Sequence, residues 1–342
     1  MSQKEKDTIE VLMEIGSMTD STIYDLLQKE SSEDFFDAVK FLITTGGKRV
    51  RPSLTLLFCE AAGGNKKSAF GPAAGIELLH NYSLIMDDII DNSTLRRGNP
   101  TVWKKYGIPI ALLIGMHYRE AAFEATKQVR NAEQINELFS QAIRAMIEGE
   151  RLDILYEQAG RTEPYILKHR YKEVTQEAYF DMIGRKTAEI IKVACKAGVL
   201  CANNAPKELL AAAGKYGWNA GLAFQLVDDY LDLFAHEEEF GKEIGKDIKE
   251  HKLGNLVIIY TLEELEEDKR NKLLNIIRQE NPIQQDISWV ISTLKTTNAP
   301  DRVKKEAKFL EKEAKNAIAV FPDSKAKKLL IDLVEFIVER TY

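Results

Sequence analysis

The pattern Asp-Asp-x-x-Asp occurs twice in this chain of 342 residues, at positions 87–91 and 228–232. Each copy lies in an apolar stretch typical of a helix, where residues four apart share a face. The first and last aspartates of each copy are therefore neighbours. About 4 Å apart, two carboxylates repel by roughly 4 kcal/mol at an effective dielectric constant near 20, which a cation would offset. All-oxygen clusters suit Mg²⁺, which keeps several waters and often joins carboxylates to substrate phosphates.

Basic residues follow both acidic motifs, which separates them from an ordinary solvated helix face. Arg96-Arg97-Gly98 comes after the first motif, and Lys242, Lys246 and Lys252 come after the second. Carboxylates that hold metal, next to cations that hold phosphate oxygens, are typical of a diphosphate site. The sequence therefore predicts metal-assisted chemistry on a diphosphate.

Further motifs follow in order along nearly the whole chain. In sequence they are Gly46-Gly47-Lys48-Arg49-Val50-Arg51-Pro52, Glu77-Leu78-Leu79-His80, Asp87-Asp88-Ile89-Ile90-Asp91, Arg96-Arg97-Gly98, Gly184-Arg185-Lys186-Thr187-Ala188, Phe224-Gln225-Leu226-Val227-Asp228-Asp229-Tyr230-Leu231-Asp232 and Gly245-Lys246-Asp247. Together they resemble the trans-isoprenyl diphosphate synthases. The resemblance implies an all-α fold, a bundle of antiparallel helices around a central active-site cavity, and we expect a single domain over residues 1–342.

The coarse pattern of the chain also favours helices, since proline is scarce, at nine residues, and period-two alternation is absent. We expect helices over 32–45, 72–91, 207–235 and 300–318. Charged breaks are expected at 160–164 and 237–243.

Composition excludes several classes of protein. The net charge is −6, from 47 basic and 53 acidic residues, which argues against a nucleic-acid partner. The three cysteines lack metal-ligand spacing and are expected to be thiols in a reducing cytosol. No apolar run approaches the roughly 18 residues of a membrane helix. We therefore expect a cytoplasmic enzyme with no transmembrane segment.

The resemblance implies a Mg²⁺-dependent head-to-tail condensation, in which an allylic prenyl diphosphate loses diphosphate and isopentenyl diphosphate attacks the resulting cation. Three magnesium ions are expected, with Asp87, Asp91 and Asp228 as direct ligands. Asp88 and Asp229 point about 100° away from their motif partners, so we expect them to reach metal through water or to orient the ligands. The residues with expected catalytic roles are Lys186, Asp87, Asp88, Asp91, Asp228, Asp229 and Asp232.

By the same resemblance, each substrate has its own group of polar residues. A metal-free pocket for isopentenyl diphosphate is expected from Lys48, Arg51, His80 and Arg97. Contacts with the allylic diphosphate are expected from Arg96, Lys186, Thr187, Gln225, Lys242 and Lys252. His80 lies seven positions before Asp87, about two helical turns, and so projects on nearly the same face.

The chain departs from the family pattern at four places. Met86 stands where the family commonly has His, and Gly115-Met116-His117 where it usually has Gly-Asp. Gly149-Glu150 replaces Gly-Gln, and Leu253-Gly254-Asn255 replaces a Lys-Thr-Leu-Pro type of ending. None of these changes removes an aspartate or a basic residue with an expected role.

Product length is expected to depend on Tyr82 and Ser83, five and four residues before Asp87, because bulk there would block the growing chain. An aromatic followed by a small residue resembles archaeal geranylgeranyl diphosphate synthases and favours a C20 product. A C15 product, or one of C25 and longer, remains an alternative. A class I terpene cyclase and a non-catalytic partner subunit are less favoured, since both acidic motifs are intact. A homodimer is expected.

Overall fold

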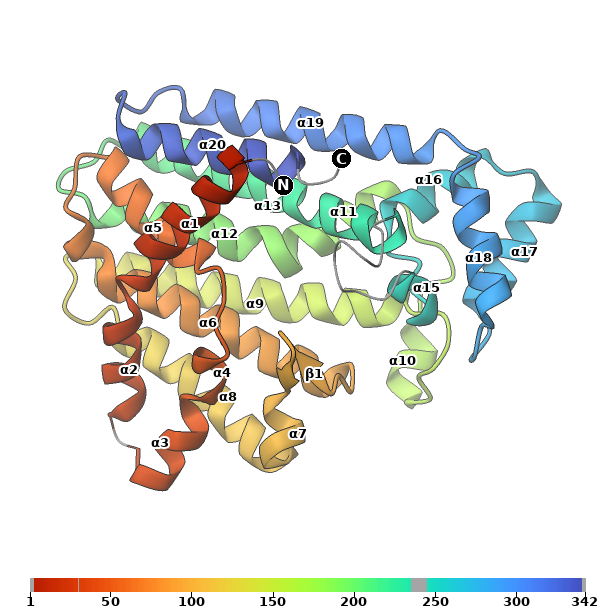
Figure 1. The fold of residues 1–342 in the computed structure, drawn as a ribbon, viewed down its shortest axis with the longest axis horizontal. Coiled ribbons are helices and arrows are strands. Elements are labelled where there is room, and N and C mark those ends of the chain that lie inside the picture. The colour runs from red at the N-terminus through yellow and green to blue at the C-terminus, as the bar shows by residue number, and fades with distance from the viewer. Residues whose placement is uncertain (1–2, 30, 235–244, 340–342) are drawn as a thin grey trace. The chain divides into compact units, whose positions relative to one another are not determined.

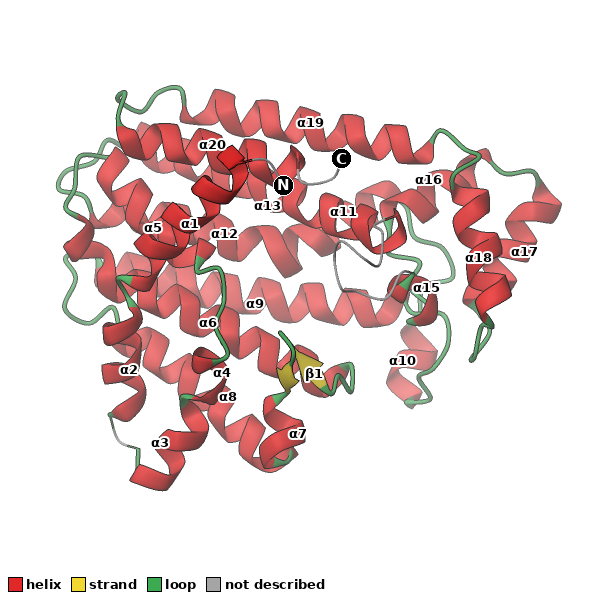
Figure 2. Cartoon of the chain, in the orientation of Figure 1, coloured by secondary structure: helices red, strands yellow, loops and turns green. Residues whose placement is uncertain are grey.

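The computed structural model describes residues 3–29, 31–234 and 245–339 and has the predicted all-α fold. Within these residues the one sheet is a two-stranded hairpin of β1 (Leu95–Arg96) and β2 (Asn99–Pro100), shown in yellow in Figure 2. None of the helices in the described ranges is both long enough and apolar enough to cross a membrane.

The chain forms two compact units. Unit 1 comprises Met1–Arg144, Ile190–Gly217 and Asn316–Leu333, and unit 2 comprises Ala145–Glu189, Trp218–Lys315 and Val334–Tyr342. The prediction of a single domain over 1–342 stays a prediction.

The helices of unit 1 are mostly short and precede residue 125. They are α1 (Gln3–Ser17), α2 (Asp20–Gln28), α3 (Glu33–Val39), α4 (Phe41–Thr44), α5 (Val50–Ala61), the 3₁₀ turn η1 (Lys66–Ala69), α6 (Phe70–Ile90), α7 (Val102–Tyr106) and α8 (Ile108–Glu124). Five further helices contribute residues to both units: α9 (Ala132–Tyr156), α12 (Glu189–Cys201), α13 (Lys207–Phe234), α19 (Ala299–Ile318) and α20 (Lys325–Glu339).

Unit 2 adds the helices that surround the second acidic motif. They are α10 (Pro164–His169), α11 (Gln176–Ile183), the π-helical turn η2 (Gly184–Ala188), α15 (Lys246–Lys249), α16 (Leu256–Glu264), α17 (Glu267–Ile277) and α18 (Gln284–Leu294). In Figure 1 α17 and α18 lie side by side.

The core of unit 1 is built on α6, which packs along α8 (Figure 1). Its apolar residues, among them Ile76, Leu79 and Ile85, are fully buried. The first turn of α6 comes very close to the end of α8, since a Cβ added to Gly71 would lie 2.1 Å from the carbonyl oxygen of Ala125. This packing fixes the position of the C-terminal end of α6, which carries the first acidic motif.

The predicted helices agree with the structure at both acidic motifs. The helix expected over 72–91 is α6, which ends at Ile90 with Asp91 as its C-cap, and the one expected over 207–235 is α13. The helix expected over 300–318 is α19, and the break at 160–164 separates α9 from α10. The break expected at 237–243 lies outside the described residues.

The helix expected over 32–45 is wrong as a single element, because it breaks at Lys40 into α3 and α4. It ends before Gly46 and Gly47, as expected. Gly46 has a φ of 84°, a left-handed conformation that glycine adopts without strain.

Candidate active site

The first acidic motif lies at the end of α6, where the middle aspartate is bound by an arginine. Arg96 donates from Nε to both carboxylate oxygens of Asp88, each at 2.9 Å, and from Nη2 to Oδ1 at 2.8 Å. Asp88 is buried, while Asp87 and Asp91 are partly exposed. Asp88 therefore orients Arg96, in a charge-assisted pair that is among the stronger polar contacts in proteins.

The β1–β2 hairpin places Arg96 and Arg97 beside the motif. Arg97 and Gly98 form its turn with φ values of 54° and 75°, and two left-handed residues in succession are typical of a tight type I′ turn. Arg97 Nη1 donates to the carbonyl oxygen of Gly46, and a Cβ on Gly47 would lie 3.0 Å from the same nitrogen. The hairpin thus contacts the loop that contains Gly46, Gly47 and Lys48.

Three of the four residues predicted to bind isopentenyl diphosphate interact in unit 1. Arg51 Nη1 lies 3.1 Å from His80 Nε2 and donates to it. Burial, together with the charges of Arg51 and Arg97, holds the pKa of His80 well below its usual value. His80 is therefore a neutral acceptor for Arg51 near pH 7. Lys48, the fourth, is exposed on the neighbouring loop.

Arg49 anchors that loop, a role that the sequence did not reveal. It is buried with a φ of 47°, and it donates to Glu77 at 2.8 Å and to Asp20 at 3.0 Å. Glu77 also accepts from Asn81 at 3.1 Å. The second arginine of the Gly-Gly-Lys-Arg-Val-Arg-Pro motif points to His80 and the first holds the loop to α6.

The two residues predicted to set product length lie on α6. A Cβ added to Gly115 of α8 would lie 3.5 Å from Tyr82 Cδ2 and 2.4 Å from Met86 Cε. Tyr82 and Met86 therefore pack against α8 where it has no side chain. Ser83 donates its hydroxyl to the carbonyl oxygen of His80 at 2.8 Å.

The second acidic motif lies at the end of α13, in unit 2, and its middle aspartate has neutral partners. Asp229 accepts from the hydroxyl of Tyr179 at 2.6 Å and from Gln225 Nε2 at 2.8 Å. Gln225 Oε1 in turn accepts from the Thr187 hydroxyl at 2.8 Å. Thr187 and Gln225 meet as predicted, whereas Tyr179 was missed, because a buried tyrosine in a helix has no functional signature.

Carboxylates crowd at the end of this motif. Asp232 Oδ2 accepts from the backbone N–H of Asp247 at 3.0 Å, and the side chain of Asp247 accepts from Asn255 at 2.8 Å. Burial and the charge of Asp247 raise the pKa of Asp229 well above its usual value, and the same two causes raise the pKa of Asp232 to about 7. With its carboxyl groups ionised, the cluster would hold more negative charge than its surroundings offset.

This donor set fits a hard cation. Within the described part of the chain no three His, Cys, Asp or Glu side chains converge closely enough to hold a metal ion by themselves. Mg²⁺ needs one or two carboxylates and completes its octahedral shell with waters and substrate phosphates. The crowded carboxylates of unit 2 and the aspartates of α6 are therefore suited to that ion.

A network of ion pairs joins α9 to the π-helical turn η2. Lys186 Nζ lies 2.7 Å from Asp153 Oδ2 and 2.7 Å from Glu150 Oε2. Lys252 Nζ lies 3.5 Å from the same oxygen of Asp153 and 3.1 Å from Glu250 Oε2. Burial alone would raise the pKa of Asp153, but the two lysines outweigh it and hold the pKa well below its usual value.

Lys186 and Lys252, both predicted to bind the allylic diphosphate, are thus brought together by Asp153. Sequence reasoning missed Asp153, although it lies three residues after Glu150 and so on the same helix face. Lys242, the remaining predicted contact, lies outside the described residues.

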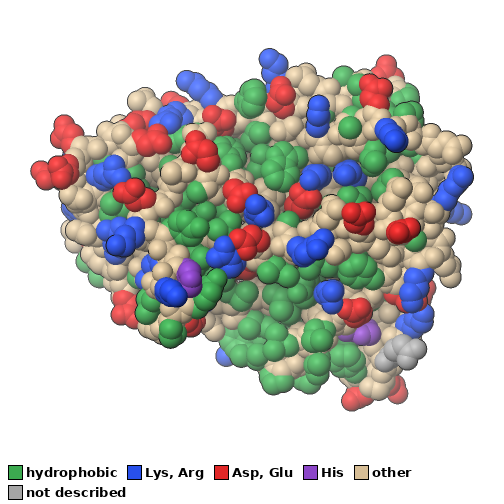
Figure 3. Space-filling model, turned by 180° about the vertical axis from the view of Figure 1, so that it is seen from behind, with side chains coloured by type: hydrophobic (Ala, Val, Ile, Leu, Met, Phe, Trp, Pro, Cys, Tyr) green, Lys and Arg blue, Asp and Glu red, His purple; other side chains and the backbone are tan. Residues whose placement is uncertain are grey.

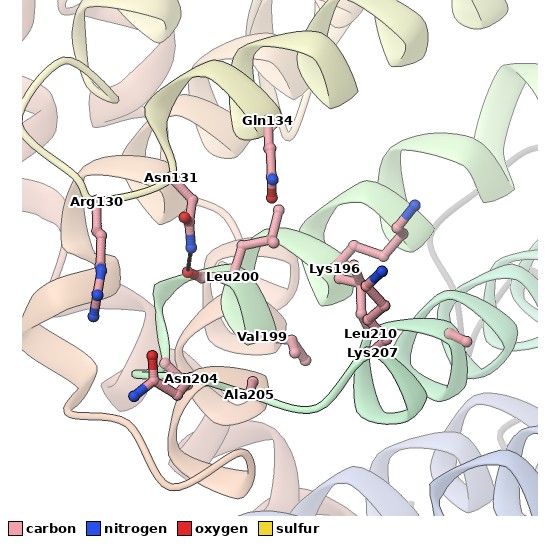
Figure 4. Close-up of a pocket in the computed structure, with 12 residues that line it drawn as sticks. Arg130, Asn131, Gln134, Lys196, Val199, Leu200, Asn204, Ala205, Lys207 and Leu210 are labelled. Atoms are coloured by element: carbon pink, nitrogen blue, oxygen red, sulfur yellow. Dashed lines mark hydrogen bonds between the residues drawn. The ribbon is translucent and has the colours of Figure 1, made fainter.

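A pocket of about 610 Å³ in unit 1 contains none of the predicted site residues (Figure 4). Arg130, Lys196 and Lys207 contribute to its lining, together with apolar residues of α12 and α13. The chemistry predicted from the sequence therefore belongs to other parts of the chain.

Comparison with known proteins identifies the family. The sequence model of the polyprenyl synthetases matches residues 32–294. The chain belongs to the polyprenyl synthetase family. It is similar to a short chain isoprenyl diphosphate synthase of Methanothermobacter thermautotrophicus, with 34% identity over 98% of this chain and 99% of that protein. It is also similar to a geranylgeranyl diphosphate synthase of Methanosarcina mazei, with 31% identity over 96% of each chain.

Solved structures agree with this assignment. A crystal structure of geranylgeranyl pyrophosphate synthetase from Pyrococcus horikoshii matches with a TM-score of 0.89 and 32% identity, over 99% of this chain and 100% of that one. The prediction of a polyprenyl synthetase with an all-α fold is confirmed. This member of the family is an enzyme, a prenyltransferase.

Proposed function

We propose that this prenyltransferase condenses isopentenyl diphosphate head-to-tail with an allylic prenyl diphosphate, and that geranylgeranyl diphosphate is its main product. The observation that carries the proposal is the cluster of Arg51, His80 and Arg97 in unit 1. A neutral histidine among arginines suits a diphosphate bound without metal. An enzyme that condenses two diphosphates needs such a pocket, and a cyclase with one substrate does not.

We assign Asp87, Asp91 and Asp228 as the direct ligands of three magnesium ions. When bound, Mg²⁺ supplies positive charge to the departing diphosphate. Asp88 holds Arg96 in place for the negative charge of the diphosphate, and Asp229 positions Gln225. The excess negative charge around Asp232 supports this assignment.

Basic and polar residues would hold the allylic diphosphate. We assign this role to Arg96, Lys186, Thr187, Gln225, Lys242 and Lys252. Lys186 and Lys252 take up charge as the carbon–oxygen bond breaks, because an ammonium group already in place needs no reorganisation. The hydrogen bond from Thr187 to Gln225 fixes the orientation of the amide group, whose Nε2 donates to Asp229.

Product length would be set on α6. Tyr82 packs toward α8 beside Gly115, more than one turn before Asp87, so its ring would end the space for the prenyl tail. The small side chain of Ser83 leaves room on the next face. This arrangement supports a stop at C20 rather than at C15 or at C25 and longer.

We also propose that the enzyme is a cytoplasmic homodimer. Ile108, Leu112 and Met116 repeat every four residues on α8 and are exposed, as is Leu113. Figure 3 shows a broad group of hydrophobic side chains on the face opposite to that of Figure 1. A repeated apolar helix face of this kind suits a second copy of the chain. Light scattering measures the oligomeric state of the wild type and of Leu113→Asp. We expect the wild type to be a dimer and the variant to be a monomer.

One assay tests the proposed reaction against its alternatives. The protein is incubated with labelled isopentenyl diphosphate, farnesyl diphosphate and Mg²⁺, and the products are separated by chromatography. We expect a C20 prenyl diphosphate. A cyclised hydrocarbon would indicate a terpene cyclase, and no product would indicate a non-catalytic partner subunit.

A second assay tests the metal-free pocket. Arg51→Lys keeps the charge but loses the planar fork of the guanidinium group. We expect a KM for isopentenyl diphosphate raised about tenfold, with a smaller change for the allylic substrate. A larger rise for the allylic substrate would reverse the assignment of the two pockets.

A further inference from the structure

The backbone of η2 lies against α9 at a glycine. A Cβ added to Gly149 would lie 2.4 Å from the backbone nitrogen of Lys186, too close for any other residue. Lys186 belongs to the π-helical turn, a feature that is frequent at functional sites, and its side chain meets the turn of α9 that follows Gly149. Its ammonium group therefore reaches Glu150 and Asp153 together, at 2.7 Å from each carboxylate.

The ion pairs around Lys186 form a chain of alternating charge. In order its members are Glu150, Lys186, Asp153, Lys252, Glu250 and Lys246. These six residues are three carboxylates and three ammonium groups, so their charges sum to zero. With glutamine at position 150 the same chain would carry one net positive charge.

This balance matters for a lysine that binds a diphosphate. An anion gains most from a cation whose charge is unmatched, and less from one that already faces two carboxylates. Asp153 contacts both lysines, so its removal would disrupt the contacts of both. Glu150 is only partly buried, and Asp153 still joins the two lysines without it, so its charge can be removed without separating Lys186 from Lys252.

We propose that Glu150 is a positioning residue that acts through Lys186 and weakens the binding of the allylic diphosphate. The inference rests on the proposed function, in which Lys186 binds that substrate. In the empty site Glu150 holds Lys186 in place. When a diphosphate is bound, the carboxylate competes with it for the ammonium group, and the prenyl diphosphate leaves more readily.

The test is Glu150→Gln, which keeps the size and a hydrogen-bond acceptor but removes the charge. We expect the KM for the allylic diphosphate to fall about tenfold and the KM for isopentenyl diphosphate to stay within about twofold. Inorganic pyrophosphate with Mg²⁺ should bind about tenfold more tightly, as measured by calorimetry. The pyrophosphate measurement needs no turnover, so it tests the inference even if the wild type fails to elongate a prenyl chain, a failure that would overturn the proposed function alone.

The matched control is Glu148→Gln. Glu148 lies on the same helix, but it pairs with Arg151, at 2.5 Å from Oε1 and 2.8 Å from Oε2. This variant removes the same charge without touching Lys186, and we expect no change in either KM. Equal shifts in the two variants would show a general charge effect and overturn the proposal.

Two further variants guard against a structural explanation. Glu150→Asp keeps the charge and should keep the allylic KM within about twofold of the wild type. Glu150→Ala removes the charge and should shift the KM in the same direction as Glu150→Gln, which keeps the test valid if the glutamine variant folds poorly. An unchanged or raised allylic KM in the variants without charge would overturn the proposal.

Discussion

The two copies of Asp-Asp-x-x-Asp share a sequence pattern but have opposite electrostatic surroundings. In unit 1 the middle aspartate, Asp88, is buried against the guanidinium group of Arg96. In unit 2 the equivalent Asp229 accepts from the neutral groups of Tyr179 and Gln225, and its pKa is raised by burial and by Asp247. The pattern decides which carboxylates lie together. Partners from elsewhere in the chain decide how much negative charge is left for a cation.

The largest effect is expected from removing a proposed metal ligand. Asp87→Ala or Asp228→Ala should lower kcat/KM by at least about a thousandfold, because the leaving group then lacks its electrophile. Unit 2 has the larger uncompensated negative charge. Asp228→Ala should therefore also raise the Mg²⁺ concentration for half-maximal rate more than Asp87→Ala does. Steady-state assays over a Mg²⁺ titration measure both. Near-wild-type turnover in either variant, with circular dichroism showing intact helices, would falsify the assignment.

A second prediction changes unit 1 so that it resembles unit 2. Arg96→Ala leaves Asp88, which is 1% exposed, without its charge partner, and should lower the free energy of unfolding by about 2–4 kcal/mol. Denaturant unfolding without metal measures the change. Asp88→Asn in the same background should recover part of the loss. A loss below about 0.5 kcal/mol would mean that the pair does not satisfy the charge of the first motif.

The helices that carry the motifs could be predicted because their apolar spacing is local in the sequence. The contacts that distinguish the motifs could not, since the partners are distant. Tyr179 lies 50 residues before Asp229, and Asp153 lies 33 residues before Lys186. Arg96 was predicted to bind substrate, and its hold on Asp88 depends on a hairpin whose strands have two residues each. Strands of that length leave no periodic signal.

Product length is expected to respond to unit 1 alone. Tyr82→Ala removes an aromatic ring, and each CH₂ buried in the freed space is worth about 0.8 kcal/mol, which favours continued elongation. The product should shift from C20 to C25 or longer. Tyr179→Phe, which removes the hydroxyl that donates to Asp229, should lower the rate about tenfold and leave the product at C20. Chromatography at equal conversion compares the two. An unchanged product from Tyr82→Ala would place the end of the tail elsewhere.

The uncompensated negative charge around Asp232 in unit 2 also predicts that the stability of the fold depends on pH. The folded state raises the pKa of Asp232 to about 7, above its value in the unfolded chain. A carboxyl group of this kind favours folding while it is protonated, and that contribution is lost as the pH rises from about 4 to about 7. Asparagine at this position stays neutral, so Asp232→Asn removes the dependence.

The most direct test compares metal-free wild type with Asp232→Asn by denaturant unfolding at pH 5 and pH 8. We predict that the variant is more stable than the wild type by about 1–2 kcal/mol at pH 8, that the gain shrinks at pH 5, and that Mg²⁺ with inorganic pyrophosphate reverses the order at pH 8. A variant less stable than the wild type at pH 8 without metal would contradict the account, because the second motif would then hold no uncompensated charge.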